Sequence, residues 1–446
     1  MGEDAGRAQR RDLGGVKQVS STVLVIAHGH PEFSPGGGEV AAYQLFCALQ
    51  NRKGVKRAVF MARHSSSDWT GQISILRNDE FLWSTGISDW FKAQSARPHA
   101  VTGTFRKFLK TIRPDIVLLH HYAHMGVEIL REIRNTCPSS KIVLTLHEYM
   151  GICHNIGQMV KRGSAELCFG ESLQACVGCF PDRSEEDFWL RKHFIRRHFD
   201  AVDRFIAPSE FLRQRYIAWG LPAERIAVIE NGQPDGARHA PRTLAPGGLR
   251  NRFAFFGQVT PFKGVDVLLS ALANLPRKQR KDIHVEIHGA NLESQDEAFR
   301  NRIEALRRPL MEEGVLHWPG AYHRDDLGRR MARIDWVVVP SVWWENSPVV
   351  IQEAFRFGRP LLCSNIGGMA EHVRDGIDGL HVGVGNTSDW GETLVSAAAD
   401  VEGWDRFYHN MKTPLPVERA AERYLAWALD EASPGLGALP RLAADF

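Results

Sequence analysis

The sequence of 446 residues lacks any apolar run near the roughly 20 residues that a bilayer-spanning helix needs. Its N-terminal segment is polar and lacks the apolar core of a secretory signal. A formal net charge of +3 gives no field strong enough to make nucleic acid an expected partner. We therefore expect a cytoplasmic protein whose N-terminal segment is a flexible lead-in.

Two familiar nucleotide-binding patterns are also missing. The glycine-rich loop at 36–38 has neither the G-x-G-x-x-G spacing of dinucleotide-binding folds nor the Lys-Ser/Thr pair of a P-loop. Seven cysteines make an odd number, which argues against a disulfide framework. In the cytosol most of them are expected to be reduced.

Short β-branched runs alternate with helical patterns along the whole chain, which predicts parallel sheets with crossover helices. The expected strands of the first half are 22–28, 57–63, 115–122, 141–148, 204–207 and 226–230. Those of the second half are 253–257, 284–289, 315–319, 335–340, 360–364 and 380–384.

A stretch rich in Gly and Pro, 231–248, separates the two series and is the best linker in the sequence. We predict an N-terminal domain at 20–235, a second domain at 249–412, and a C-terminal segment, 413–446, whose helix packs on one of the halves. Ligands of open α/β sheets bind beyond the carboxyl ends of the strands, so the expected site is the cleft between the domains.

Two loops could approach an anion. Gly36, Gly37 and Gly38 precede a helix, where unhindered backbone N–H groups can bind a phosphate. In the second half, Lys263 stands where a helix begins and could neutralise one. A mobile turn and a solvated lysine are the alternatives.

The most informative segment is 340–354, PSVWWENSPVVIQEA. Ser347 and Pro348 predict an N-cap and first helical residue, which leaves the amides of Val349 and Val350 free at a helix start. Glu345 and Glu353 bracket that start, and carboxylates suit the hydroxyls of a sugar or ribose.

Glu345 and Glu353 have the E-x7-E spacing typical of retaining glycosyltransferases of family 4. The segment 340–354 resembles that family's donor-site signature, and segments 37–39, 207–211, 231–232 and 257–264 resemble further family motifs. The resemblance spans residues 22 to 385. It implies an α/β protein of the GT-B fold, with two Rossmann-like doubly wound domains facing a central cleft.

The resemblance also implies roles for individual residues. Glu353 is expected to bind the donor ribose and Glu345 the hexose hydroxyls, while Lys263 and the amides of 347–350 hold the diphosphate. The expected catalytic residues are His147, Glu345 and Lys263. The expected donor-binding residues are Gly37, Gly38, Gln258, Lys263, Asn346, Ser347, Val349, Val350 and Glu353. Gln258 departs from the family, which has an arginine there. Glutamine cannot bind the diphosphate as a charged fork, so Lys263 or an arginine from elsewhere in the chain is expected to bind it instead.

No two aspartates lie two positions apart, so the Asp-x-Asp motif of metal-dependent sugar transfer is absent. We therefore expect no catalytic metal. A structural zinc is one interpretation of the cysteine loop 150–185, whose C-x-x-C pair and two further cysteines give a tetrahedral ligand count; four reduced thiols are the other. The cysteines concerned are Cys153, Cys168, Cys176 and Cys179.

Two further features border the predicted cleft. His120, His121 and His124 follow a strand and are candidates for acceptor contact. The segment 188–199 mixes aromatic and basic residues, which fits either a core helix or peripheral contact with the inner face of the plasma membrane.

The predicted function is transfer of a hexose from a UDP- or GDP-sugar to a glycan or lipid-linked acceptor, with retention of the donor's anomeric configuration. A non-catalytic nucleotide-sugar-binding protein and a sugar-nucleotide epimerase of the same fold are the alternatives. A turnover assay distinguishes an enzyme from the non-catalytic protein, because a scaffold binds the nucleotide sugar but releases no diphosphate product.

Overall fold

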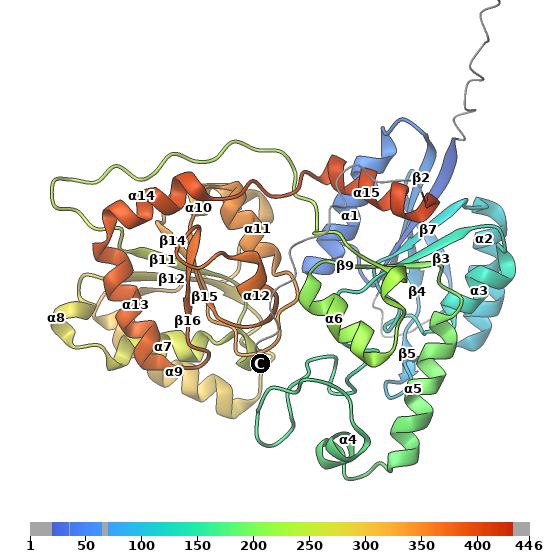
Figure 1. Cartoon of the computed structure of the whole chain (residues 1–446), viewed down its shortest axis with the longest axis horizontal. Coiled ribbons are helices and arrows are strands. Elements are labelled where there is room, and N and C mark those ends of the chain that lie inside the picture. Colours follow the sequence, from blue (N-terminus) through green and yellow to red (C-terminus); the bar gives the residue numbers. More distant parts are fainter. Residues whose placement is uncertain (1–19, 35, 65–69, 431–446) are drawn as a thin grey trace, which may run out of the picture.

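The computed structural model describes residues 20–34, 36–64 and 70–430. The predicted N-terminal lead-in lies outside these residues, as does the chain beyond Asp430. The described chain forms two α/β units, each built around one sheet (Figure 1).

The first sheet has eight strands in the order β10-β9-β8-β7-β1-β2-β4-β3, and all neighbours are parallel except β3 and β4. Its strands are β1 (Ser21–Ala27), β2 (Val55–His64), β3 (Ile73–Arg77), β4 (Glu80–Ser84), β7 (Ile116–Leu119), β8 (Lys141–Thr145), β9 (Arg204–Ala207) and β10 (Ile226–Val228). A separate small hairpin joins β5 (Ile87–Asp89) to β6 (Gln94–Ser95).

The second sheet has six parallel strands in the order β13-β12-β11-β14-β15-β16. Its strands are β11 (Arg252–Gln258), β12 (His284–Ala290), β13 (Leu316–His317), β14 (Trp336–Val339), β15 (Leu361–Ser364) and β16 (Gly379–Val382). This is the doubly wound order of a nucleotide-binding sheet: strands β11 to β13 are added toward one edge, and β14 to β16 are added on the other side of β11.

Helices cover both faces of each sheet, which explains why central strands such as β7 and β14 are apolar and buried throughout. On the first sheet, α2 (Arg106–Ile112), α3 (Ile129–Thr136), α5 (Glu185–Phe199) and α6 (Glu210–Trp219) enclose one core, and α1 (Gly37–Gln50) and α15 (Val417–Leu429) the other. On the second sheet, α7 (Val265–Asn274), α9 (Glu297–Glu312), α13 (Thr387–Ala399) and α14 (Val401–Asn410) face α10 (Leu327–Met331), α11 (Val349–Arg356) and α12 (Gly367–His372). Short elements complete the chain: η1 (Ala100–Phe105), α4 (Leu173–Cys179), η2 (Ala223–Arg225), η3 (Pro261–Lys263), α8 (Arg277–Arg280) and η4 (Arg324–Asp326).

All twelve strands expected from the sequence are present, with ends shifted by up to three residues. The segment 73–95, which forms β3 to β6, was not predicted. Its turn at Asn78 and Asp79, where Asp79 has φ 61°, was the available signal for the β3–β4 hairpin.

The C-terminal helix α15 packs on the first half although it follows the second in sequence. Tyr424 of α15 lies in the core beside α1, and Val417 N donates to the carbonyl of Gln233 in the linker. In Figure 1 the red α15 lies next to the blue α1, so the chain crosses between the two units twice.

Helix α5 packs in the core, as one of the two interpretations of segment 188–199 predicted. Phe188, Ile195 and Phe199 are buried, so one face of the helix packs in the core as the periodicity predicted. Trp189 and Leu190 are about half exposed on another face. Among the described residues, no helix is long and apolar enough to cross a membrane.

Candidate active site at the two switch points

The reversal of strand order in each sheet places four loops where ligands of such folds bind. In the first sheet these loops follow β1 and β7, and in the second they follow β11 and β14. The two units meet at two points beside these loops, one in the segment after β1 and the other in the segment after β8. A Cβ built on Gly37 would lie 3.2 Å from Cγ2 of Val349, and Asn346 Nδ2 donates to the carbonyl of His147 at 2.6 Å.

The glycine loop lies between the donor motif and a group of histidines. Gly37 faces Val349 at the start of α11, whereas a Cβ on Gly38 would be 3.4 Å from Cε1 of His28 and 3.8 Å from Cγ of His147. The predicted helix is present but begins earlier than expected: α1 starts at Gly37 with Gly36 as its N-cap, so Gly37 and Gly38 lie in its first turn and not before it. A side chain at Gly37 would therefore press against the second unit, and one at Gly38 against the histidines of the first.

Glu345 and Lys263 are in direct contact. Lys263 Nζ donates to Oε1 of Glu345 at 2.5 Å, and the same oxygen accepts hydrogen bonds from Ser341 Oγ at 2.8 Å and Trp343 Nε1 at 2.9 Å. Only 6% of Glu345 is exposed, so three donors compensate a buried carboxylate. An ammonium has three N–H donors, which leaves two on Lys263 for a further ligand.

A tight backbone contact explains the glycine after Lys263. Gly264 has φ 68°, and a Cβ there would lie 1.9 Å from the carbonyl oxygen of Pro340. The loop after β11 can therefore approach the loop after β14 only with glycine at this position, and this approach brings Lys263 to Glu345.

Glu353 lies one turn inside α11 and is 5% exposed. Burial raises the pKa of Glu353, while the Arg324 guanidinium opposes this by donating to Oε1 at 2.6 Å. Arg324 was not identified from the sequence, because nothing in the spacing of the His323–Asp326 segment relates it to a glutamate 29 positions away. It is a cation beside the predicted donor site.

The start of α11 differs from the prediction by one residue. The helix begins at Val349, and Pro348, not Ser347, is its N-cap; the Ser347 hydroxyl instead accepts a hydrogen bond from Gln352 Nε2 at 3.2 Å. The proline has no side-chain acceptor, so the first-turn amides of Val349 and Val350 have no capping partner. Gln258 is exposed at the end of β11.

His147 lies at the carboxyl end of β8 and shares a hydrogen bond of 2.9 Å between its Nε2 and Nδ1 of His120. Burial lowers the pKa of His147 to about 4, and the nearby His28 adds to the effect, so the ring is neutral at pH 7. His28 Nε2 in turn lies 3.0 Å from Oε1 of Glu39.

A parallel pair lies one residue further along both strands. His121 Nδ1 accepts the N–H groups of Tyr122 and Ala123, so its proton is on Nε2, which points at Oε1 of Glu148, 3.5 Å away. Burial raises the pKa of Glu148 to about 8, so this carboxyl is largely protonated at pH 7. The structure thus brings the predicted histidines together, while Glu148 was not predicted.

The cysteine loop contacts the donor motif. The carbonyl of Cys168 accepts the indole N–H of Trp344 at 2.9 Å, and the Trp344 ring packs against Phe169 and Phe211 with centroids 5.1 and 5.0 Å away. Trp344 is 6% exposed and belongs to the core of the first unit. The residue before Glu345 is therefore anchored in the opposite half.

The predicted four-cysteine ligand set is not formed in this arrangement. All four thiols are free, and within residues 20–34, 36–64 and 70–430 no group of three or more His, Cys, Asp or Glu side chains could hold a metal ion. Cys176 and Cys179 lie on α4, whereas the Cys168 thiol turns to the carbonyl of Gly170 at 3.2 Å. Zinc binding stays a prediction.

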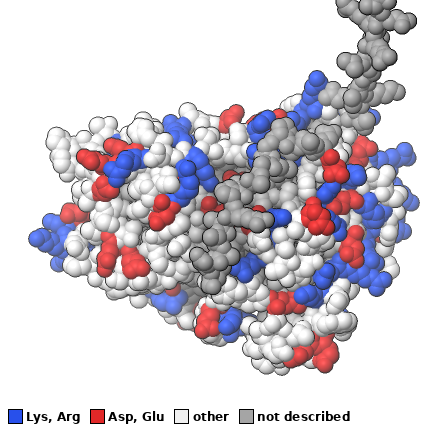
Figure 2. All heavy atoms as spheres, viewed as in Figure 1, with Lys and Arg blue, Asp and Glu red and all other residues white. Residues whose placement is uncertain are grey.

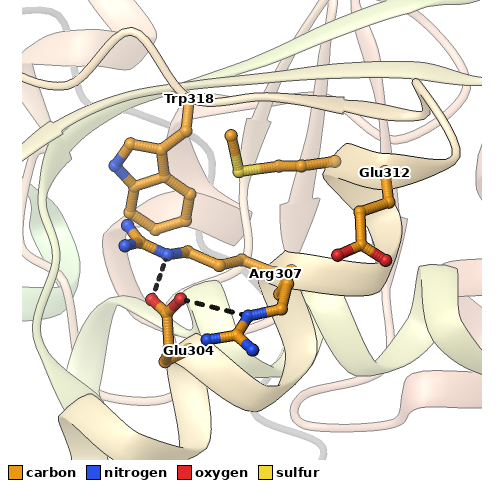
Figure 3. A pocket seen from close by; sticks show the side chains of 6 residues that line it. Glu304, Arg307, Glu312 and Trp318 are labelled. Atoms are coloured by element: carbon orange, nitrogen blue, oxygen red, sulfur yellow. Dashed lines mark hydrogen bonds and ion pairs between the residues drawn. The ribbon is translucent and has the colours of Figure 1, made fainter.

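A surface hollow lies elsewhere. It has a volume of about 400 Å³ on the outer surface of α9 (Figure 3) and is lined by Glu304, Arg307, Arg308, Met311, Glu312 and Trp318. Arg307 is bonded to Glu304 and covers the Trp318 ring at 5.2 Å. None of the predicted site residues lines it.

Two doubly wound units with their switch points facing each other define the GT-B fold, and known structures agree. HepE from Anabaena, solved with UDP and glucose, aligns with a TM-score of 0.61 and 16% identity over 92% of this chain and 99% of HepE. Sucrose-phosphate synthase from Thermosynechococcus elongatus aligns with a TM-score of 0.64 and 15% identity over 92% and 97%. At such identities the likeness establishes the fold.

Sequence comparison supplies the family. Residues 35–234 match the family model for glycosyltransferase family 4, and residues 242–412 match that for glycosyl transferases group 1. D-inositol 3-phosphate glycosyltransferase from Mycobacterium sp. strain KMS is 32% identical over 206 residues, and lipopolysaccharide 1,2-N-acetylglucosaminetransferase from Salmonella typhimurium is 26% identical over 197. These matches span 44% and 42% of this chain and 45% and 50% of the relatives, about half their length. The chain belongs to the family 4 type of GT-B glycosyltransferases.

Proposed function

We propose that this protein transfers a hexose from a UDP- or GDP-sugar to a glycan or lipid-linked saccharide, with retention of the anomeric configuration. The observation that carries the proposal is the pair of buried carboxylates, Glu345 and Glu353, each bonded to a cation and flanking the uncapped start of α11. The structural neighbour HepE was solved with UDP and glucose, and this supports a nucleotide-sugar donor.

In the proposed reaction the diphosphate lies at the start of α11. The amides of Val349 and Val350 and the remaining N–H donors of Lys263 stabilise the negative charge that develops on the leaving nucleoside diphosphate. Arg324 lies beside Glu353 on this side of the site and supplies a positive charge that Gln258 lacks. We propose no catalytic metal, because these groups can carry the charge stabilisation.

The sugar end of the donor lies toward the first unit in this proposal. Glu345 accepts hydrogen bonds from hexose hydroxyls, and Glu353 accepts those of the ribose. His147, neutral at pH 7 and bonded to His120, positions the reacting sugar and does not serve as the base. The acceptor hydroxyl attacks from the leaving-group face, and a donor phosphate oxygen takes its proton.

Variants of the donor site test the proposal. Lys263→Ala and Glu353→Ala are expected to lose most of the transferase activity while their circular dichroism and melting temperatures stay near those of the wild type. Lys281→Ala, which removes an exposed lysine of the same unit, is the matched control. Proton NMR of the product should show the anomeric configuration of the donor. Full activity in both site variants, or an inverted product, would contradict the proposal.

The same measurements test the alternative of a non-catalytic scaffold. A scaffold binds the nucleotide sugar, but purified protein then releases no nucleoside diphosphate with any acceptor. Release of UDP or GDP that depends on Lys263 identifies an enzyme.

We also propose peripheral contact with the cytoplasmic face of a membrane, where a lipid-linked acceptor would be found. Helix α5 exposes Trp189 and Leu190, and the neighbouring α3 and α2 expose Arg131 and Lys107. Lysine and arginine side chains gather at this edge of the molecule (Figure 2). Sedimentation with phosphatidylglycerol vesicles should retain the wild type and release Leu190→Glu. Equal sedimentation of both would exclude this face.

A further inference from the structure

The small hairpin that the sequence did not predict holds a tryptophan in solvent beside the histidines. Asp89 Oδ1 accepts the backbone N–H groups of Phe91 and Lys92 at 2.8 and 3.1 Å, which fixes the turn that carries Trp90. The hairpin is tied to the loop after β7, because Val127 N donates to the carbonyl of Ala93 at 2.8 Å. Trp90 is 45% exposed.

Ring contacts connect Trp90 to the reaction centre. The rings of Trp90 and His124 form a T-shaped pair, with centroids 5.1 Å apart and an interplanar angle of 86°. His124 is stacked on His28 at 5.3 Å and 19°. A Cβ built on Gly38 would lie 3.4 Å from Cε1 of His28 and 3.8 Å from Cγ of His147, so these two rings flank the same glycine. The series Trp90, His124, His28 and His147 therefore leads from the glycine loop to the surface of the first unit.

Two histidines of this group, His124 and His121, are neutral at pH 7. Burial lowers the pKa of His124 to about 3 and that of His121 well below its usual value. Burial alone would raise the pKa of Glu39, but hydrogen bonds from His28 and Ser34 outweigh it, so this carboxylate is ionised with both partners in place. The nearby cation, Arg63, donates its Nε to the carbonyl of Thr85 at 2.9 Å.

Such a surface suits hydroxyl groups better than phosphates. Neutral imidazoles both donate and accept hydrogen bonds, as sugar hydroxyls do. An exposed indole offers a flat apolar face to the C–H groups of a pyranose ring. A phosphorylated acceptor would instead need cations with free N–H donors.

We propose that Trp90 and His124 form an acceptor subsite for an uncharged sugar ring, with the indole face stacked on the ring and His124 bonded to its hydroxyls. The inference rests on the proposed transferase function for its placement beside the donor site. It assigns to the chain an acceptor whose terminal sugar is unphosphorylated.

Saturation-transfer difference NMR on the full chain with UDP present tests the subsite. The probes are methyl β-D-glucopyranoside and methyl α-D-mannopyranoside, with glucose 6-phosphate as the anionic comparison. At least one glycoside should give saturation transfer with the wild type. The signal should fall at least fivefold in Trp90→Ala, recover in part in Trp90→Phe, and persist in Ile75→Ala, which trims another exposed apolar side chain of this unit.

Three results would overturn the subsite: equal glycoside signals in the wild type and Trp90→Ala, no glycoside signal at all, or a stronger glucose 6-phosphate signal that is independent of Trp90. The thermal shift caused by UDP keeps the two proposals apart. If UDP does not raise the melting temperature of the wild type, the donor site is contradicted. If UDP raises the melting temperature of Trp90→Ala as much as that of the wild type, the effect of the variant is confined to the acceptor side.

Discussion

Trp344→Phe tests whether the cysteine loop holds the two units together. The substitution keeps an aromatic ring in the socket of Phe169 and Phe211 but removes the indole N–H that the Cys168 carbonyl accepts at 2.9 Å. A lost hydrogen bond that leaves a buried acceptor unsatisfied costs about 1–3 kcal/mol. Because Trp344 reaches from the donor-binding unit into the core of the other, this free energy stabilises the arrangement in which the two units face each other.

The same free energy should appear in donor binding. If the nucleotide needs both units in place, a loss of about 1–3 kcal/mol weakens UDP binding by a factor of roughly 5 to 150. Isothermal titration calorimetry gives the dissociation constant for UDP, and urea unfolding gives the free energy of unfolding.

Trp427→Phe is the matched control. Its indole N–H donates to the carbonyl of Phe205 at 3.0 Å within the first unit, away from the donor motif. This variant should lose a similar free energy of unfolding while its affinity for UDP stays near that of the wild type. Equal UDP dissociation constants for Trp344→Phe and Trp427→Phe would refute the reasoning.

Three further predictions concern residues of the first unit. The folded protein keeps Glu148 protonated up to a pKa of about 8, whereas in the unfolded chain this carboxyl is already ionised at pH 6.5, so the free energy of unfolding should fall between pH 6.5 and 8. Urea midpoints of the wild type should decrease over this range, and those of Glu148→Gln should decrease less. Parallel curves for the two proteins would contradict the raised pKa. His120→Phe removes the ring partner of His147 and should lower kcat about tenfold with little change in the donor KM, whereas unchanged kcat would exclude a positioning role. Elemental analysis should find one zinc per chain if the cysteines bind it, and chelation should then lower Tm; absence of zinc with an unchanged Tm rejects the prediction.

The sequence determined the fold and much of the donor site because both depend on local pattern. Strands such as Trp336–Val339 are apolar throughout since both faces of their sheet are covered, and this pattern is legible without the structure. Glu345 and Glu353 lie within one loop and one helix, so their spacing in the chain fixes their spacing in space.

Only the tertiary structure decided which distant groups meet. The contacts Arg324–Glu353, Trp344–Cys168 and His121–Glu148 join segments that are 27 to 176 positions apart, and no periodicity encodes such pairs. Burial also acts through this packing: the neutral state of His147 and the raised pKa of Glu148 arise from the layers of protein around them. The hairpin that presents Trp90 was missed for the same reason, because two short strands are stabilised by contacts with the loop after β7 and carry little pattern of their own.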